Sequence, residues 1–60
     1  MTSLVLVRPD LYCVLVDGRR VGFVQRRSGR YLPLRTDGTK AGRSHSSRKR
    51  AVAVLTGERS

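Results

Sequence analysis

The stretch that decides the fold runs from residue 11 to residue 35 and reads LYCVLVDGRRVGFVQRRSGRYLPLR. Its β-branched, aromatic and leucine side chains fall into three runs, which predict strands over 11–16, 20–26 and 30–35. Asp17-Gly18 separates the first two runs and Arg27-Ser28-Gly29 separates the last two. Both are tight-turn sequences, so the stretch predicts an antiparallel meander.

Side-chain alternation assigns faces within two of these strands. It places Val21 and Phe23 on one face of the second strand, and Leu32 and Leu34 on one face of the third. Pro33 cannot donate a backbone hydrogen bond to a neighbouring strand. We therefore expect the third strand to lie at an edge of the sheet or to be locally bulged.

The segments on either side of the meander are less regular. Residues 1–10 contain alternating Leu and Val side chains that end at Pro9, which predicts an N-terminal arm or a short edge strand. Asp37-Gly38 predicts a third turn, followed by a short fourth segment over 39–43.

After residue 43 the hydrophobic period becomes that of a helix. Ser44-His45-Ser46-Ser47 supplies N-cap residues, and Ala51, Val54 and Leu55 share one face of a helix predicted over 48–55. Gly57 is a natural stop. Because a helix of about ten residues does not persist alone, it must pack on the sheet.

The predicted fold class is α+β, a three- or four-stranded antiparallel β-meander with one C-terminal α-helix packed on it. We expect one domain over 11–57, preceded by the arm or edge strand of 1–10 and followed by a tail at 58–60. The predicted core consists of Val14, Val21 or Val24, Leu32, Ala51 and Leu55.

Composition limits how stable and how complex such a domain can be. The chain has 60 residues, of which 38% are hydrophobic and 5% aromatic, so its core is thin, and dimerisation or a partner would complete it. Cys13 is the only cysteine, which excludes an intrachain disulfide and a cysteine-based zinc site. We expect it to be a small buried strand residue in a reducing compartment. The apolar run at 4–7 is too short for a signal core or a membrane span, so we expect a cytoplasmic protein that does not interact with membranes.

The charge is extreme for this length. Thirteen Lys and Arg face four Asp and Glu, which gives a net charge of +9. Codon bias in a GC-rich genome would explain the preference for Arg over Lys, but it does not explain the net charge. Such an excess favours a polyanionic partner, of which nucleic acid is the common example.

Catalysis has little support in the sequence. His45 is the only histidine, and the few acids lie in or beside turns or near the C-terminus. No carboxylate pair, histidine cluster or phosphate-binding glycine loop is present, so we expect no enzymatic activity, no cofactor and no metal site.

The basic residues are organised around the predicted turns and the start of the helix. Three of them at the helix start, where the macrodipole is unfavourable to cations, predict a phosphate clamp with the serines before them. The predicted nucleic-acid-binding residues are Arg19 and Arg20 at the first turn, Arg26, Arg27 and Arg30 at the second, Arg35, Lys40 and Arg43 at the third, and Arg48 and Lys49 in the helix.

Residues 37–55 resemble the third strand and helix of the arm-type, AP2-like DNA-binding domains at the N-terminus of tyrosine recombinases. The likeness rests on the turn Asp37-Gly38, the basic residues Lys40 and Arg43, and a helix that begins Ser-Arg-Lys and packs through Ala51 and Leu55. His45 and Arg50 depart from that pattern. The resemblance implies a three-stranded sheet laid in the major groove of DNA with the helix behind it, and no recombination chemistry.

The sequence is therefore interpreted as a small DNA-binding module of the kind that phages, plasmids and other mobile elements encode. We expect its sheet to read duplex DNA, and we expect the chain to be a monomer or weak homodimer. Two alternatives stay open. The same charge suits an RNA- or ribosome-binding protein, and an exposed edge strand at 4–7 would suit a protein-interaction module with an acidic partner.

Overall fold

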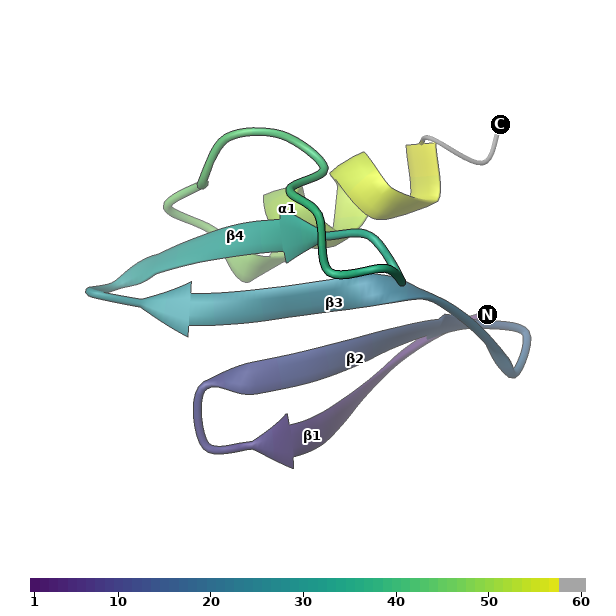
Figure 1. The fold of residues 1–60 in the computed structure, drawn as a ribbon. Helices are drawn as coiled ribbons and strands as arrows, with labels where there is room; N and C mark the ends of the chain where they lie inside the picture. The colour runs from purple at the N-terminus through teal and green to yellow at the C-terminus, as the bar shows by residue number, and fades with distance from the viewer. Residues whose placement is uncertain (58–60) are drawn as a thin grey trace.

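The computed structural model describes residues 1–57. It contains one sheet and one helix, made of β1 (Thr2–Arg8), β2 (Leu11–Val16), β3 (Arg19–Arg27), β4 (Arg30–Leu34) and α1 (Arg48–Gly57). The four strands are antiparallel in the order β1-β2-β3-β4, and α1 lies across one face of the sheet (Figure 1). The predicted α+β meander with one C-terminal helix is thus confirmed. The expected tail at 58–60 lies outside the described residues.

Both inner hairpins turn through two residues with left-handed backbone. The β2–β3 turn has φ of 52° at Asp17 and 80° at Gly18, and the β3–β4 turn has 51° at Ser28 and 75° at Gly29. Two successive residues with positive φ match the right-handed twist of the strands that they join. The turns predicted at these two places therefore form as tight two-residue connections.

A bulge in β3 changes the direction of one side chain. Val14 pairs with Gly22, but the next residue, Leu15, pairs with Arg20, so Val21 is the extra residue in the ladder. Val21 packs against the core beneath α1. The predicted alternation, which put Val21 on the same face as Phe23, is wrong at this residue.

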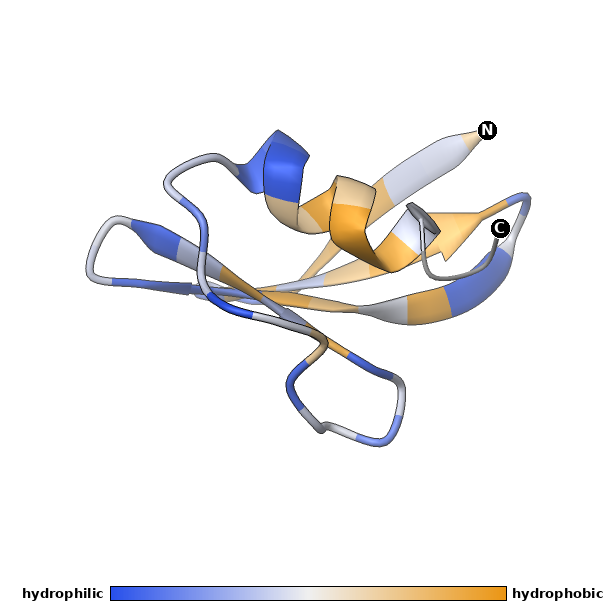
Figure 2. Cartoon of the chain, turned by 90° about the horizontal axis from the view of Figure 1, so that it is seen from above, coloured by the Kyte–Doolittle hydropathy of each residue, from blue (hydrophilic) through white to orange (hydrophobic). Residues whose placement is uncertain are grey.

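The core lies between the sheet and α1. Its buried cluster consists of Val14, Val24, Ala41, Ala51 and Leu55, and hydropathy is highest in the middle of the strands and in the middle of α1 (Figure 2). Four of these residues were predicted, and Cys13 is buried as expected. Leu32 was predicted to be in the core but is only half-buried on the opposite face. Leu32 pairs with Gln25, whereas the next pair in the register, Val24 with Pro33, is fully buried beneath α1. Adjacent pairs face opposite sides of the sheet, so Leu32 faces away from α1.

An irregular segment, residues 39–45, covers the outer edge of β4. Tyr31 and His45 exchange two backbone hydrogen bonds of 2.7 and 2.8 Å, and the Ala41 amide donates to the Pro33 carbonyl at 2.9 Å. Since that carbonyl points outward, the ring nitrogen of Pro33 also faces this irregular side, and no bond to β3 is lost. The expected fourth segment over 39–43 makes only isolated bridges, so the fourth strand of the sheet is β1.

Candidate nucleic-acid interface

Acidic side chains neutralise little of the positive charge. Leaving out Glu58 and Arg59, which lie outside the described residues, twelve Lys and Arg face three Asp. Asp17 accepts a hydrogen bond from the ammonium group of Met1, which lowers the pKa of that carboxyl group. Within residues 1–57, Arg35 aside, no Lys or Arg side chain forms an ion pair. The cations are therefore available to an external anion.

Four of the predicted cations line one hollow beside the β3–β4 turn, which we call the tip hollow. Its volume is about 370 Å³, and it is lined by Arg27, Ser28, Arg30, Leu32, Lys40, Gly42, Arg43 and Ser44. Arg30 is fixed in place, because its Nε donates to the Ser44 hydroxyl at 2.9 Å and its Nη2 to the Ser44 carbonyl at 3.2 Å. Segment 39–45 thus brings Lys40 and Arg43 to the cations of the hairpin.

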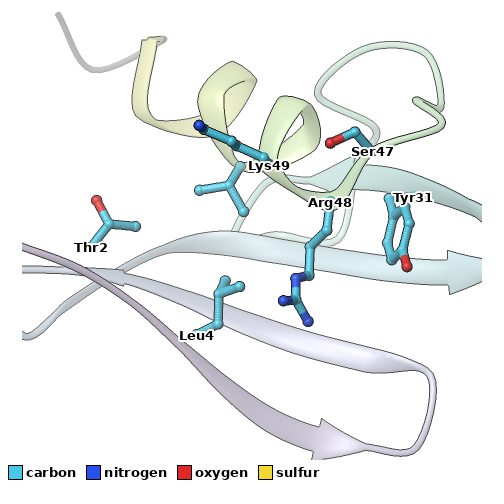
Figure 3. Close-up of a pocket in the computed structure, with 7 residues that line it drawn as sticks. Thr2, Leu4, Tyr31, Ser47, Arg48 and Lys49 are labelled. Carbon is cyan, nitrogen blue, oxygen red and sulfur yellow. The ribbon is translucent and has the colours of Figure 1, made fainter.

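A second hollow, the helix hollow, lies between the start of α1 and β1. Its volume is about 560 Å³, and its lining consists of Thr2, Leu4, Tyr31, Ser47, Arg48, Lys49 and Val52. Figure 3 shows Arg48 extending from the start of α1 toward the sheet, between Leu4 and Tyr31. The Arg48 guanidinium lies 5.2 Å from the centre of the Tyr12 ring, a cation–π contact that orients it.

The two hollows come together near the tip of the β3–β4 hairpin. Tyr31 of the helix hollow is the neighbour of Arg30 of the tip hollow and pairs across the hairpin with Arg26. Figure 2 shows the start of α1 and the ribbon beside the β3–β4 turn as hydrophilic, as it does the β2–β3 turn and the loop after β4. The cationic end, as we call this region, consists of Arg26, Arg27, Arg30, Lys40, Arg43, Arg48 and Lys49.

The other three predicted residues lie elsewhere. Arg19 and Arg20 begin β3 and so stand about 25 Å from its far end. The guanidinium of Arg20 lies 5.9 Å from the centre of the Phe23 ring. Arg35 donates from Nη1 to the Lys40 carbonyl at 2.7 Å. Seven of the ten predicted residues therefore lie in the cationic end, Arg35 adjoins it through Lys40, and Arg19 and Arg20 stand apart from it.

The sheet face opposite α1 is apolar at its centre. The strand register places on it Val5, Leu11, Cys13, Leu15, Phe23, Leu32 and Leu34, with Gln25 in the middle, Ser3 and Arg20 toward one end and Arg27 and Arg30 at the other. Reading base edges needs hydrogen-bonding side chains, and the middle of this face offers few. Its cations, Arg27 and Arg30 among them, lie at the ends of the strands.

Sequence reasoning missed several polar residues of the two hollows. Ser44 was interpreted as part of a capping segment, but it holds Arg30 and lines the tip hollow. Ser28 was interpreted as a turn residue only but lines the tip hollow, and Tyr31, in the predicted third strand, lines the helix hollow. The signal for Ser44 was its place in the polar stretch 44–47, which does not reveal that this stretch folds back along β4.

His45 has a structural place, bridging to Tyr31 through its backbone. Within residues 1–57, no three His, Cys, Asp or Glu side chains come together as a metal site would require. The same part of the chain has no helix with the length and hydropathy needed to cross a bilayer. Comparison with protein-family models, curated proteins and solved structures found no match to this chain.

Proposed function

We propose that this protein binds duplex DNA through its cationic end. The observation that carries the proposal is the gathering of seven cations, none of them in an ion pair with another residue of 1–57, around one hairpin turn and one helix start. Holding so many like charges together is unfavourable in isolation. Phosphate groups would offset that repulsion and release their own condensed counterions.

The shape of this end suits a groove. The β3–β4 turn projects beyond the β1–β2 turn (Figure 1), and it carries Arg27 and Arg30 at its base. A two-stranded ribbon fits the major groove of B-DNA, whereas the deep major groove of an A-form RNA helix is too narrow for side chains to read. The projecting hairpin therefore favours DNA over duplex RNA.

The start of α1 adds a second set of phosphate donors. The Ser47 carbonyl accepts the first helical hydrogen bond, from the Ala51 amide at 3.2 Å. The amides of residues 48–50 precede that bond and have no helical acceptor. With Arg48 and Lys49 beside them, and no acidic residue in the first turn, these amides support the phosphate clamp that we propose here.

Single-stranded RNA is the weaker candidate. Proteins that bind single strands present exposed aromatic rings on which bases stack. Here Tyr12, Phe23 and Tyr31 are each half-buried, and Tyr12 and Phe23 already have an arginine over the ring. We therefore retain the prediction from the sequence that the protein binds DNA. The proposed contact surface, however, is the cationic end and not the middle of the sheet face.

The test compares two adjacent arginine pairs at opposite ends of the same strand. With five or six phosphates contacted, log K should fall against log salt with a slope of about −5 for the unchanged protein. Replacing Arg26 and Arg27 by Ala should flatten the slope by about two units. The Arg19→Ala, Arg20→Ala double variant carries the same net charge and should leave the slope nearly unchanged.

Titration of a labelled duplex over a series of salt concentrations measures these slopes. Equal flattening in both double variants would mean that net charge, and not the cationic end, determines binding. Tighter binding to single-stranded RNA than to the duplex would replace DNA by RNA in the proposal. Absence of duplex binding at about 50 mM salt, where phosphate contacts are strong, would refute it.

A further inference from the structure

β1 is an edge strand with exposed side chains. All of its residues are exposed, and Leu4, Val5, Leu6 and Val7 keep between 36% and 59% of their accessible surface. It stands first in the strand order, so one side pairs with β2 while the other meets no strand within residues 1–57 (Figure 1). An exposed apolar edge of this kind is a template for pairing with another chain.

The hydrogen-bond pattern shows which backbone groups face outward. The Asp17 amide donates to the Met1 carbonyl at 2.9 Å, and the pairing with β2 then continues without a break as far as Leu6. Bonded and non-bonded pairs alternate along an antiparallel ladder. Val5 is therefore bonded to β2, whereas Leu4 and Leu6 direct their N–H and C=O groups away from the sheet.

We propose that this edge binds a second copy of the chain, with the two β1 strands antiparallel about a two-fold axis near Leu4 and Val5. The two four-stranded sheets then become one continuous sheet. Registers that pair even-numbered residues with even-numbered ones keep the faces matched. Leu4 and Leu6 of one copy then lie beside those of the other on the α1 side, and the two Val5 side chains lie close on the opposite side.

The distribution of charge favours a second copy over a charged partner. Residues 2–7 contain no titratable side chain, although the chain carries a net charge of +9. This strand is the opposite edge of the sheet from β4, where segment 39–45 and the tip hollow lie. Two copies can therefore meet here with their tip-hollow cations kept apart, and the cations nearest to β1 are Arg48 and Lys49 of the helix hollow. An acidic partner would instead be attracted to the cationic end.

The helix leaves the apolar side chains of β1 largely uncovered. α1 packs mainly on β3 and β4, so Leu4 lies on the α1 side of the sheet without a helix above it and lines the helix hollow. A two-fold dimer would place apolar side chains of the second copy beside this uncovered part. Small domains often need such an addition to complete a thin core.

The dimer should be weak. A standard interface buries roughly 800 Å² on each partner, close to a fifth of the 4319 Å² surface of this chain. One edge strand and the side chains beside it supply less than that. We therefore expect a monomer–dimer equilibrium in the micromolar-to-millimolar range.

Salt separates this inference from the proposed function. Analytical ultracentrifugation from micromolar to millimolar protein would be run at about 0.1 M and about 1 M salt, where the Debye length falls from about 10 to 3 Å. Screening reduces the repulsion between two cationic copies, so dimerisation should strengthen at the higher salt, whereas binding to DNA weakens. The experiment can therefore contradict dimerisation without contradicting DNA binding, and the reverse.

Amide hydrogen exchange identifies the surface that pairs. In the monomer the Val5 amide is protected by β2, and the amides of Leu4 and Leu6 exchange freely. In the dimer all three should be protected. A dimer in which Leu4 and Leu6 still exchange freely would place the interface elsewhere and overturn the proposal.

Substitution supplies the matched control. Leu6→Lys puts a charge at the centre of the interface and should raise the dimer dissociation constant at least tenfold, as should Val5→Lys on the other face. Ala53→Lys adds the same charge at an exposed position of α1 and should change the dimer dissociation constant little. Circular dichroism checks that each variant is folded. A chain that stays monomeric at millimolar concentration and high salt, or dimers that survive both β1 substitutions, would refute the proposal.

Discussion

Leu55 of α1 packs directly against the backbone of Gly22 in β3. A Cβ atom placed on Gly22 would lie 2.8 Å from Cδ2 of Leu55 and 2.4 Å from the carbonyl oxygen of Leu34 in β4. Both distances are shorter than real contacts allow, so a side chain at residue 22 would displace Leu55 and press on the backbone of β4.

The first prediction follows from that contact. Gly22→Ala should lower the free energy of unfolding by about 1–3 kcal/mol, because the new methyl group displaces Leu55 and strains the neighbouring carbonyl of β4. Thermal or urea unfolding measures the change. Gly57→Ala is the matched control, because a Cβ there meets nothing within 4 Å and alanine is the better helix former. Equal destabilisation by both substitutions would contradict this account.

Leu55 itself carries the second prediction. It is 1% exposed and is among the largest fully buried side chains, so Leu55→Ala should cost about 2–5 kcal/mol, a large part of the stability of so small a domain. Leu6→Ala, at a residue that is 59% exposed, should cost far less when measured at a concentration where the chain is monomeric. An unchanged melting temperature in Leu55→Ala would show that α1 does not depend on this residue.

Local chemistry was enough to predict the meander. Asp17, Gly18 and Gly29 adopt positive φ values that their residue types tolerate, and Ser28 adopts one before a glycine in the second turn. Each turn therefore specifies its own hairpin, and the helix start after the serines follows from capping preferences in the same way. Features of this kind depend on residues that are adjacent in sequence, and the sequence shows them directly.

Features that depend on pairing between strands could not be predicted. The bulge at Val21 arises from the register of β3 on β2, which no local pattern encodes. Leu32 is as hydrophobic as a core residue and lies in a predicted strand, but α1 covers the opposite face of the sheet from the one that carries Leu32. Lys40 and Arg43 join Arg30 only because segment 39–45 folds back along β4, so the sequence predicted the cations but not their grouping.

The third prediction concerns the turn that begins this segment. Asp37 Oδ1 accepts hydrogen bonds from the Thr39 hydroxyl at 2.7 Å and from the Thr39 amide at 2.9 Å, and these bonds lower the pKa of the Asp37 carboxyl from 3.8. Thr39→Ala removes the hydroxyl, so the pKa should rise toward 3.8. Carbon-detected NMR titration of Asp37 measures the shift, and Thr36→Ala is the control.

The sign of the pH dependence follows from the same bonds. A carboxyl group whose pKa is lower in the folded state contributes stability above its unfolded pKa, and loses that contribution as the pH falls through the folded value. The Thr39→Ala variant should therefore differ from the unchanged protein above a pH of about 4, and the difference should vanish in stronger acid. A difference that grows as the pH falls would contradict this assignment.

The last prediction tests the start of α1 as a phosphate clamp. Arg48→Ala should weaken DNA binding and flatten the salt slope by about one unit, the loss expected for one phosphate contact. It should do so equally on duplexes of different sequence, because a phosphate contact carries no base information.

Arg20→Ala is the matched control for this prediction. The Arg20 guanidinium also lies over an aromatic ring, 5.9 Å from the centre of Phe23, and the Arg48 guanidinium lies 5.2 Å from the centre of Tyr12. Both variants lose one positive charge and one cation–π contact, but Arg20 stands at the opposite end of β3 from the cationic end. A loss of affinity confined to Arg48→Ala would support the clamp, whereas equal losses in the two variants, or a loss that depends on the DNA sequence, would contradict it.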